Sequence, residues 1–502
     1  MSPRTAAPWL VAASVMPATI IQVVDTTIAN VALPHMQGSL GASSDQVIWI
    51  LTSYIVTAAI MTLPVGYMAQ RFGRRSVLLW SVAGFTLTSM LCGQATSLNE
   101  MVIWRIAQGA FGASLAPLSQ SILLDTFPKE KHASAMSIWG MGIMIGPILG
   151  PTLGGWLTDS YSWRYVFYIN VPLGVASLIG IYCFVPKTPT LEKRFDLLGF
   201  GLLAVAVGAL QLLLDRGEHV LWFESLEIQL YAVMIGLGLY LFTVHTLTSD
   251  QRFVSPALFR DRNYVTGVLF IFLVGIVLLA TMALLPPFLQ IWKGYPAVTT
   301  GLVLMPRGVG TMLGMMVVAR LMRHFDPRIL IILGMCTASA TLAEMARFTL
   351  EVGQTTLAMT GFVQGLGLGL VFIPTTTLAY ATLAPQLRDE GAALFSLSRN
   401  LGSSIGVSLI MALLSRNMWI NQQELAARLT LEAGLPQGLR DPSALAALPG
   451  ELIATVSRQA AEIAYVNDFH LLMWVNLAAI PMVLLLRVPK DLHEASAPAT
   501  EA

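Results

Sequence analysis

The chain has 502 residues, of which 55% are hydrophobic and 11% are charged, and its formal net charge is +1. Soluble proteins carry about 25% charged residues because their surface faces water, so this composition predicts an integral membrane protein and excludes a soluble enzyme, a disordered chain and a nucleic-acid-binding protein. The three cysteines stand singly in apolar runs and form neither a metal-binding pattern nor a disulfide framework.

Runs of about 20 mostly apolar residues, the length of one membrane-spanning helix, recur along the chain. The first run continues into VVDTTIANVALP without a small-residue cleavage site, so it is predicted to be a span and not a signal peptide. Fourteen spans are expected, in chain order over residues 5–24, 46–70, 76–99, 106–124, 133–158, 165–186, 197–214, 228–249, 263–292, 299–319, 329–343, 352–380, 392–415 and 469–486.

Lysine and arginine residues between the spans indicate the orientation, because such residues are enriched in cytoplasmic loops. An even number of spans places both termini on one side, and 18 of the basic residues lie on that side against 7 on the other, with 4 inside the spans. Both termini are therefore predicted to be cytoplasmic.

Asp25 is the only acid well inside the first span, where a charge costs roughly 2.5–3.5 kcal/mol on insertion scales. Arg105 lies at about the same depth in the fourth span, which crosses in the opposite direction. A dry site opposes ionisation of a carboxyl and a nearby arginine favours it, so the two are predicted to load and release protons near neutral pH. The alternative is a static ion pair that holds two helices together.

The fifth span carries the string GIMIGPILGPTLGG. Its glycines recur every four residues and are expected to form a smooth column for close helix contact: Gly142, Gly146, Gly150 and Gly154. Pro147 and Pro151 are expected to bend the same helix. No strand precedes this string and no lysine follows it, which excludes a phosphate-binding loop.

The fourth and twelfth spans resemble each other. QGAFGASLAPLSQSILLDTFP begins at Gln108 and QGLGLGLVFIPTTTLAYATLAP begins at Gln364, and each contains two prolines eleven residues apart. The basic loop RFGRRS after the second span has a counterpart, RHFDPR, after the tenth. Both repeats cross in the same sense, which argues for two parallel six-helix bundles with a cleft between them, as in transporters.

The expected domains are an N-terminal bundle over 1–190, two extra helices over 191–262, a C-terminal bundle over 263–490 that includes a long loop at 416–468, and a tail over 491–502. Arg307 stands in the middle of the tenth span, and a place in a substrate cavity and a structural role are equally compatible with it. The seven histidines show no ligand spacing, so no metal site is expected.

These motifs resemble those of the major facilitator superfamily, and specifically its drug–proton antiporters with fourteen spans, of EmrB type. The resemblance covers nearly the whole chain. It is carried by VVDTTIANVALP in the first span, GYMAQRFGRR at 66–75, RIAQGAFGAS at 105–114, GPILGPTLGG at 146–155 and LLLDRG at 212–217.

The resemblance implies an all-α membrane protein with the major facilitator fold, in which two extra helices join two six-helix bundles. It implies gating or structural roles for residues of the loop and fifth-span motifs, namely Gly66, Arg71, Gly73, Arg74, Arg75 and Gly155 together with the glycine column and its two prolines. The family's usual acidic residue in the loop, which helps to lock it, is replaced here by Gln70.

The function implied is proton-driven export of amphipathic drugs and toxic compounds across the bacterial inner membrane by alternating access. Asp25 would carry the proton and Arg105 would tune it. The substrate cavity is expected to include Gln22, Gln108, Arg307 and Gln364. No cofactor and no enzymatic activity are expected. The alternatives are a proton-coupled transporter of one specific metabolite and a membrane sensor that binds a ligand without moving it.

The loop over 416–468 has a net charge of −2 and two stretches with helical spacing of apolar residues, NQQELAARLTLEAG and PGELIATVSRQAAEIAYV, joined by a proline- and glycine-rich turn. Two amphipathic helices are expected. Their apolar stripes either face each other over the bundle or, as the resemblance implies, contribute to docking a periplasmic adaptor of EmrA type that leads to an outer-membrane channel.

Overall fold

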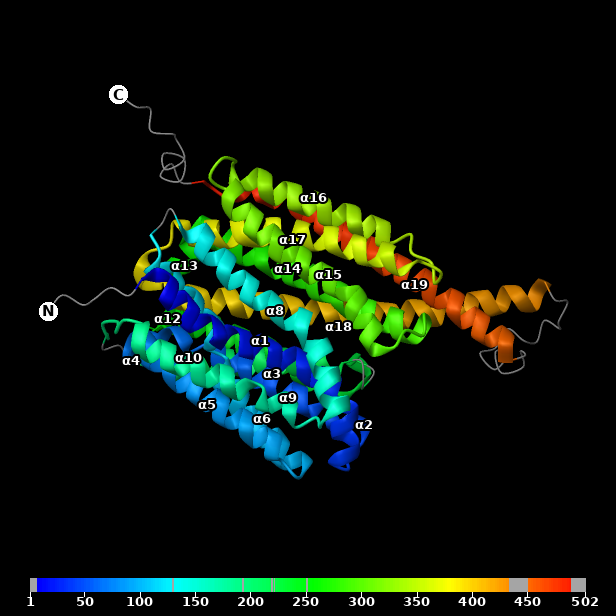
Figure 1. Cartoon of the computed structure of the whole chain (residues 1–502), viewed down its shortest axis with the longest axis horizontal. Coiled ribbons are helices and arrows are strands. Elements are labelled where there is room, and N and C mark those ends of the chain that lie inside the picture. The colour runs from blue at the N-terminus through cyan, green and yellow to red at the C-terminus, as the bar shows by residue number, and fades with distance from the viewer. Residues whose placement is uncertain are drawn as a thin grey trace.

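A computed structural model describes residues 7–128, 131–191, 194–217, 220, 222–249, 252–432 and 450–488. Within them every regular element is a helix, which confirms the predicted all-α fold (Figure 1). The α-helices are α1 (Pro8–Ser39), α2 (Ser44–Val47), α3 (Trp49–Thr62), α4 (Val65–Phe72), α5 (Arg74–Gln94), α6 (Leu98–Gly112), α7 (Leu115–Thr126), α8 (His132–Ser160), α9 (Tyr165–Tyr168), α10 (Asn170–Phe184), α11 (Leu197–Arg216), α12 (Leu226–Thr248), α13 (Pro256–Arg260), α14 (Arg262–Pro287), α15 (Ala297–Leu321), α16 (Pro327–Met345), α17 (Gln354–Ala381), α18 (Arg388–Glu432) and α19 (Gly450–Ala479).

The number of spans is close to the prediction, but the predicted count of fourteen is not confirmed. Twelve helices of the described part are long and apolar enough to cross a membrane, or thirteen if α3 and α4, bent by 55°, form one span. Pro64 separates those two helices, because proline has no N–H to continue a helix. The fourth predicted span is divided between α6 and α7 at Ala113 and Ser114, beside Gly112, and neither piece reaches 18 residues.

The two halves of the chain repeat one packing order. In the first half, α1 packs against α8 and α10, α3 against α6, and α5 against α10. In the second half, α14 packs against α18 and α19, α15 against α17, and α16 against α19. These are the same pairings, first helix with fifth and sixth, second with fourth, and third with sixth, as expected for a duplicated six-helix unit.

The two halves meet at two contacts, and the fifth helix of each half forms one of them with helices of the other half. The helix α8 of the first half packs against α15 and α17, and α18 of the second half packs against α3, α4 and α7. At the first contact, Ser137 donates a hydrogen bond to the carbonyl of Met315 at 2.8 Å, and the Trp139 ring stacks on Phe372 with centroids 6.0 Å apart.

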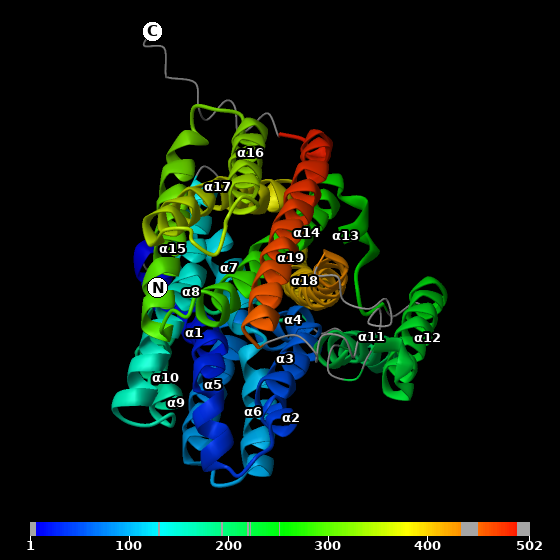
Figure 2. The ribbon, with the colours of Figure 1, turned by 90° about the vertical axis from the view of Figure 1, so that its right-hand side faces the viewer.

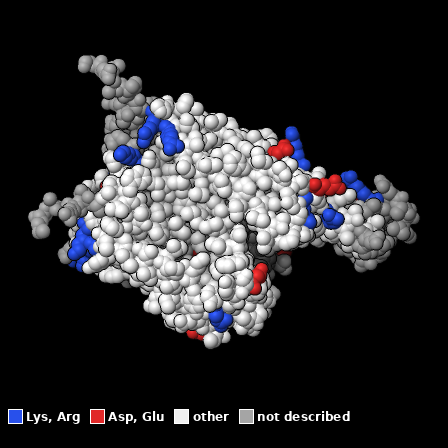
Figure 3. Space-filling view, in the orientation of Figure 1, with Lys and Arg blue, Asp and Glu red and all other residues white. Residues whose placement is uncertain are grey.

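The helices between the halves, α11 and α12, lie at the side of the bundle (Figure 2). In α11, the side-chain amide of Gln211 donates a hydrogen bond to Ser404 of α18, and the backbone carbonyl of Leu214 accepts one from Ser408 of α18. The helix α12 packs almost only against α11. Most side chains of α12 are exposed and apolar, which is the composition of a surface that faces lipid. In the view of Figure 3, charged side chains likewise gather toward the ends of the helices and leave an uncharged band between them.

Both described ends of the chain lie at one end of the bundle, which we call the terminal end. Trp9 of α1 packs on Phe127, and Asn263 at the start of α14 exchanges two hydrogen bonds with the backbone of Arg487. Figure 1 shows the start of α1 and the end of the segment after α19 on the same side. Because both ends lie on one side, the chain must cross the membrane an even number of times.

The segment predicted as a long loop extends the two helices beside it. No proline or glycine interrupts 388–432 after Gly406, so α18 continues for 45 residues, about 67 Å, and projects past the bundle (Figure 1). Its projecting part pairs with α19, since Asn421 donates to the carbonyl of Ala460 and Gln422 to Ser457. The two predicted helices thus face each other beyond the bundle, and the predicted turn lies outside the described residues.

The glycine column of α8 lies against α1. A Cβ built on Gly146 would stand 2.7 Å from the backbone of Val23, and Thr27 donates a hydrogen bond to the carbonyl of Gly146 at 3.0 Å. Gly142, Gly150 and Gly154 also lie in contact with α1. Gly155 does not belong to this contact, because a Cβ there would be 4.0 Å from its nearest neighbour. The side chains of Pro147 and Pro151 are outside the described set.

Gly146→Leu is expected to force α8 away from α1, because the backbone of Val23 cannot yield to a side chain. Overpacking of this kind typically costs about 1–3 kcal/mol, so the melting temperature of the purified protein should fall. Gly155→Leu is the matched control and should melt like the wild type. Equal melting temperatures for both variants would show that the column is not a close contact.

Candidate functional site

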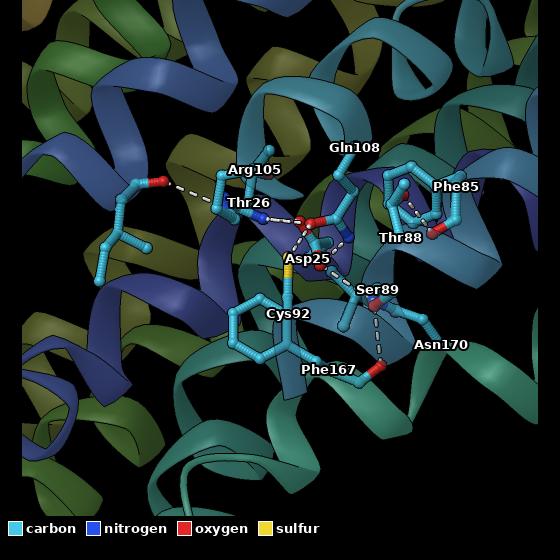
Figure 4. A network of polar contacts seen from close by, with 12 residues as sticks. Asp25, Thr26, Phe85, Thr88, Ser89, Cys92, Arg105, Gln108, Phe167 and Asn170 are labelled. Atoms are coloured by element: carbon cyan, nitrogen blue, oxygen red, sulfur yellow. Dashed lines mark hydrogen bonds and ion pairs between the residues drawn. The ribbon is translucent and has the colours of Figure 1, made fainter. Parts of the chain in front are cut away.

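The carboxylate of Asp25 is completely buried in the first half and accepts three hydrogen bonds (Figure 4). Its Oδ2 accepts from Nη1 of Arg105 at 2.6 Å, and its Oδ1 accepts from the side-chain amides of Gln108 and Asn170, each at 2.9 Å. The predicted proximity of Asp25 and Arg105 is thus a direct, charge-assisted contact.

Arg105 is held by more than the ion pair. Its Nε donates to the backbone carbonyl of Ile50 at 2.9 Å, and its guanidinium lies 4.3 Å from the centre of the Tyr54 ring, both in α3. A cation over an aromatic face is attracted by the ring quadrupole. Two contacts with α3 therefore hold the guanidinium in addition to its ion pair with Asp25.

The two amides link Asp25 to further helices. Gln108 accepts from Nη1 of Arg105 at 2.8 Å while it donates to Asp25. Asn170, at the start of α10, also donates to the hydroxyl of Ser89 in α5 at 3.0 Å, and Ser89 donates to the carbonyl of Phe167. Side chains from α6 and α10 therefore meet at the carboxylate of α1, and α5 is joined to them through Asn170.

A buried ion pair is stable only while both charges remain, because removal of one leaves the other without water or a counter-charge. Protonation of Asp25 would remove one charge in this site, while Nη2 of Arg105 and Oδ1 of Asn170 have no hydrogen-bond partner among the described residues. The network therefore holds one donor group and one acceptor that its present hydrogen bonds leave unused.

The other residues predicted for the cavity lie elsewhere. Gln22, one turn before Asp25, accepts a hydrogen bond from the backbone N–H of Ala116 at 3.1 Å. Arg307 in α15 and Gln364 in α17 are buried in the second half of the chain and do not contact the Asp25 network. Gln108 is completely buried within that network.

Sequence reasoning did not select Asn170 and Ser89, although the depth argument used for Arg105 applies to them. Ser89 stands five residues before the end of α5, and Asn170 five residues after the start of α9. Both are polar residues in apolar spans near the depth of Asp25. A search for polar residues at equal depth would have found them.

At the terminal end, an ionic cluster joins the two halves. Arg74 at the start of α5 contacts Asp125 of α7 and donates through Nε to Asp389 of α18 at 2.5 Å. Arg388 also contacts Asp125, and the hydroxyl of Ser121 donates to Asp389. These contacts bridge the two halves at the terminal end.

The remaining residues of the loop motif surround that cluster. Gly73 separates α4 from α5 with a φ of 84°, a conformation that favours glycine, and a Cβ on Gly66 would lie 2.7 Å from the Cα of Glu390 in α18. Gln70, which replaces the usual acid, donates to the backbone carbonyl of Gln386 at 3.3 Å. Arg75 binds the backbone carbonyl of Tyr182 in its own half, and Arg71 lies in α4.

Comparison with known proteins gives consistent matches. Residues 15–407 match the family model described as Major Facilitator Superfamily. The chain is 35% identical over 412 residues to the multidrug export protein EmrB of Escherichia coli strain K12, covering 81% of this chain and 79% of that protein, and 34% identical over 418 residues to the fatty acid resistance protein FarB of Neisseria gonorrhoeae, covering 82% of each. The crystal structure of the human organic anion transporter MFSD10 superposes with a TM-score of 0.60 at 13% identity, over 94% of this chain and 99% of that one, and this likeness concerns the fold alone.

Arg105→Met should destabilise the protein more than the double variant Asp25→Asn/Arg105→Met. The single change leaves a carboxylate without a counter-charge in a dry site, at a cost of about 3–5 kcal/mol, whereas the double change removes both charges. The measurement is the melting temperature of each purified variant at neutral pH. A double variant less stable than the single one would show that charge pairing does not govern the site.

Proposed function

Because the chain belongs to the major facilitator superfamily and, within it, to the EmrB type, we propose that it exports amphipathic drugs and toxic compounds across the bacterial inner membrane in exchange for protons. The observation that carries this proposal is the buried carboxylate of Asp25, held by one cation and two amides. The names of its relatives, multidrug export protein and fatty acid resistance protein, support amphipathic substrates.

In this proposal Asp25 is the proton carrier. The ionised carboxylate draws Arg105, Gln108 and Asn170 together and so fixes α1 against α6 and α10. A proton on Asp25 cancels its charge, weakens the contact with Arg105 and frees α1 to shift. One elementary charge that crosses a potential of 100 mV supplies about 2.3 kcal/mol, which is the driving energy for export.

The glycine column is the route by which that shift reaches the other half. Gly146 and its neighbours hold α8 directly on α1, close to Asp25, and α8 also packs against α15 and α17. We assign the two halves to residues 1–190 and 263–490. A movement of α1 therefore acts, through α8, on the contact between them. Alternating access is the rocking of these two units about that contact.

We assign the terminal end to the cytoplasm, as the excess of basic residues on that side indicates. The ionic cluster of Arg74, Asp125, Arg388 and Asp389 then closes the cytoplasmic entrance. Loading of a substrate requires this cluster to open. The hydrogen bond of Gln70 takes the place of the acidic contact usual at this position, so the closed state relies more heavily on Arg74.

The projecting pair formed by the ends of α18 and α19 lies on the periplasmic side in this orientation. It extends well beyond a hydrocarbon core of about 30 Å, and its exposed side chains include Trp419, Leu452 and Ile463. We propose that it docks a periplasmic adaptor of EmrA type, which continues to an outer-membrane channel.

Asp25→Asn should insert and fold but lose export driven by a pH gradient, because an amide carries no titratable proton. The assay is accumulation of a fluorescent dye in inverted vesicles under an imposed gradient, where a loss of at least about tenfold is expected. Asp159→Asn, which alters an acid that is 68% exposed at the end of α8, is the matched control and should export normally. Uphill accumulation by Asp25→Asn would remove Asp25 as the proton carrier.

Replacement of residues 427–455 by a short Gly/Ser linker should separate docking from transport. The contacts of Asn421, Gln422 and Tyr465 with the rest of the protein are retained in this design. Vesicle transport should survive, while co-purification of the adaptor and drug resistance of whole cells fall. Unchanged co-purification would show that the outer part of the projecting pair, residues 427–455, is not the docking surface.

A further inference from the structure

The second half of the protein contains a partial copy of the Asp25 site. In the first half, Asn170 of the sixth helix donates to the hydroxyl of Ser89 in the third helix at 3.0 Å. In the second half, Asn476 of the sixth helix, α19, donates to the hydroxyl of Ser339 in the third helix, α16, at 2.8 Å. The same pair of side chains therefore links the same two helices in each half.

The glutamines at the fourth helix of each half differ in their partners. Gln108 of α6 uses both ends of its amide, since it donates to Asp25 and accepts from Arg105. Gln364 of α17 is only 1% exposed, yet neither its Nε2 nor its Oε1 has a partner in the described part of the chain. A buried amide with four unused bonding positions indicates that a partner is missing.

The acid itself has no counterpart. Asp25 stands nine residues before Pro34 in α1, and the residues nine before Pro286 and Pro287 in α14 are Val277 and Leu278, neither of them an acid. The counterpart of Arg105, three residues before the glutamine, is Gly361. The second half thus lacks both members of the ion pair at the positions that the first half uses.

The side chain of Arg307, from α15, lies beside Leu278 and Gly361. The Cβ of Arg307 in α15 is 3.5 Å from where a Cβ on Gly361 would lie, and its Nη2 donates to the backbone carbonyl of Leu278 at 3.1 Å. Arg307 is 5% exposed, and its Nε and Nη1 have no hydrogen-bond partner and no acidic residue among those the structure describes. A buried cation at membrane depth without a counter-charge is rare.

The next residue places Arg307 at the contact between the halves. A Cβ on Gly308 would overlap the side chain of Ile148 in α8. Arg307 therefore stands beside the α8–α15 contact, which must open during alternating access. A molecule that enters this contact meets a cation with free donors among apolar walls.

We propose that Arg307 and Gln364 bind the anionic head group, a carboxylate, of an amphipathic substrate, at the place that corresponds to the Asp25 side chain in the first half. This inference rests on the proposed export function and narrows its substrates to molecules with an apolar body and one negative charge. Arg307 supplies two nitrogens without a hydrogen-bond partner in the described part of the chain, Nε and Nη1, and guanidinium groups match carboxylates in geometry. The Gln364 amide supplies a further donor.

The test is binding to the purified full-length protein, which does not depend on transport. The probes are dansyl-labelled dodecanoic acid and its methyl ester, and the readout is the ratio of their dissociation constants. The wild type should prefer the acid, and Arg307→Gln should weaken acid binding by about tenfold or more with little change for the ester. Arg347→Gln, which alters an arginine whose side chain is 80% exposed in the same half, should keep the preference.

A second variant covers a failure of Arg307→Gln to fold. Leu278→Asp supplies an acid beside Arg307 from within the protein and should abolish the preference for the acid, whereas Leu278→Asn should not. A wild type without preference, or a preference that survives in both Arg307→Gln and Leu278→Asp, overturns the inference. Export of the dansyl-labelled acid, measured in inverted vesicles under a pH gradient, reports on the proposed function separately from the acid-over-ester binding ratio, so either proposal can fail while the other stands.

Discussion

The structure depends on the free-energy cost of burying a charged side chain away from water. Asp25 and Arg105 are both fully buried among the helices of the first half, and each is stable only because the other is 2.6 Å away. Gln108 and Asn170 saturate one oxygen of the carboxylate, and the backbone of Ile50 and the ring of Tyr54 hold the guanidinium. Four helices, α1, α3, α6 and α10, are thereby tied to the ionisation state of a single side chain.

Small residues link the Asp25 site to the contact between the two halves. The glycines of α8 bring two backbones so close that a displacement of α1 cannot be absorbed by side chains between them. Because α8 also packs on the second half, the pair at Asp25 and the contact between the halves are mechanically linked. The ionic cluster around Arg74 and Asp389 adds a second, polar link between the halves at the terminal end.

Much of this arrangement could be predicted from the sequence, because charges inside apolar runs are rare enough to be informative. Equal depth in antiparallel spans indicates that Asp25 and Arg105 can be in contact, and four-residue spacing indicates the glycine column at Gly146. Asn170 and Ser89 were missed, since single polar residues are common in spans and only their common depth distinguishes them. The division of the fourth span into α6 and α7, and the continuation of α18 past Ser415, depend on local helix geometry that hydropathy does not contain.

The duplication also explains why Arg307 was ambiguous in the sequence. The role of Arg307 depends on its neighbours Leu278 and Gly361. These two residues stand at the positions that we compare with Asp25 and Arg105, and each one alone is an ordinary residue for a membrane helix. Only the contact of Arg307 with both shows that the second half keeps donors and lacks the acid.

The most direct test of the central claim is infrared difference spectroscopy of the reconstituted protein. Lowering the pH should produce the C=O stretching band of a buried protonated carboxyl, substrate should remove this band, and Asp25→Asn should lack it. Persistence of the same substrate-sensitive band in Asp25→Asn would contradict the claim that Asp25 is the group whose protonation drives the protein.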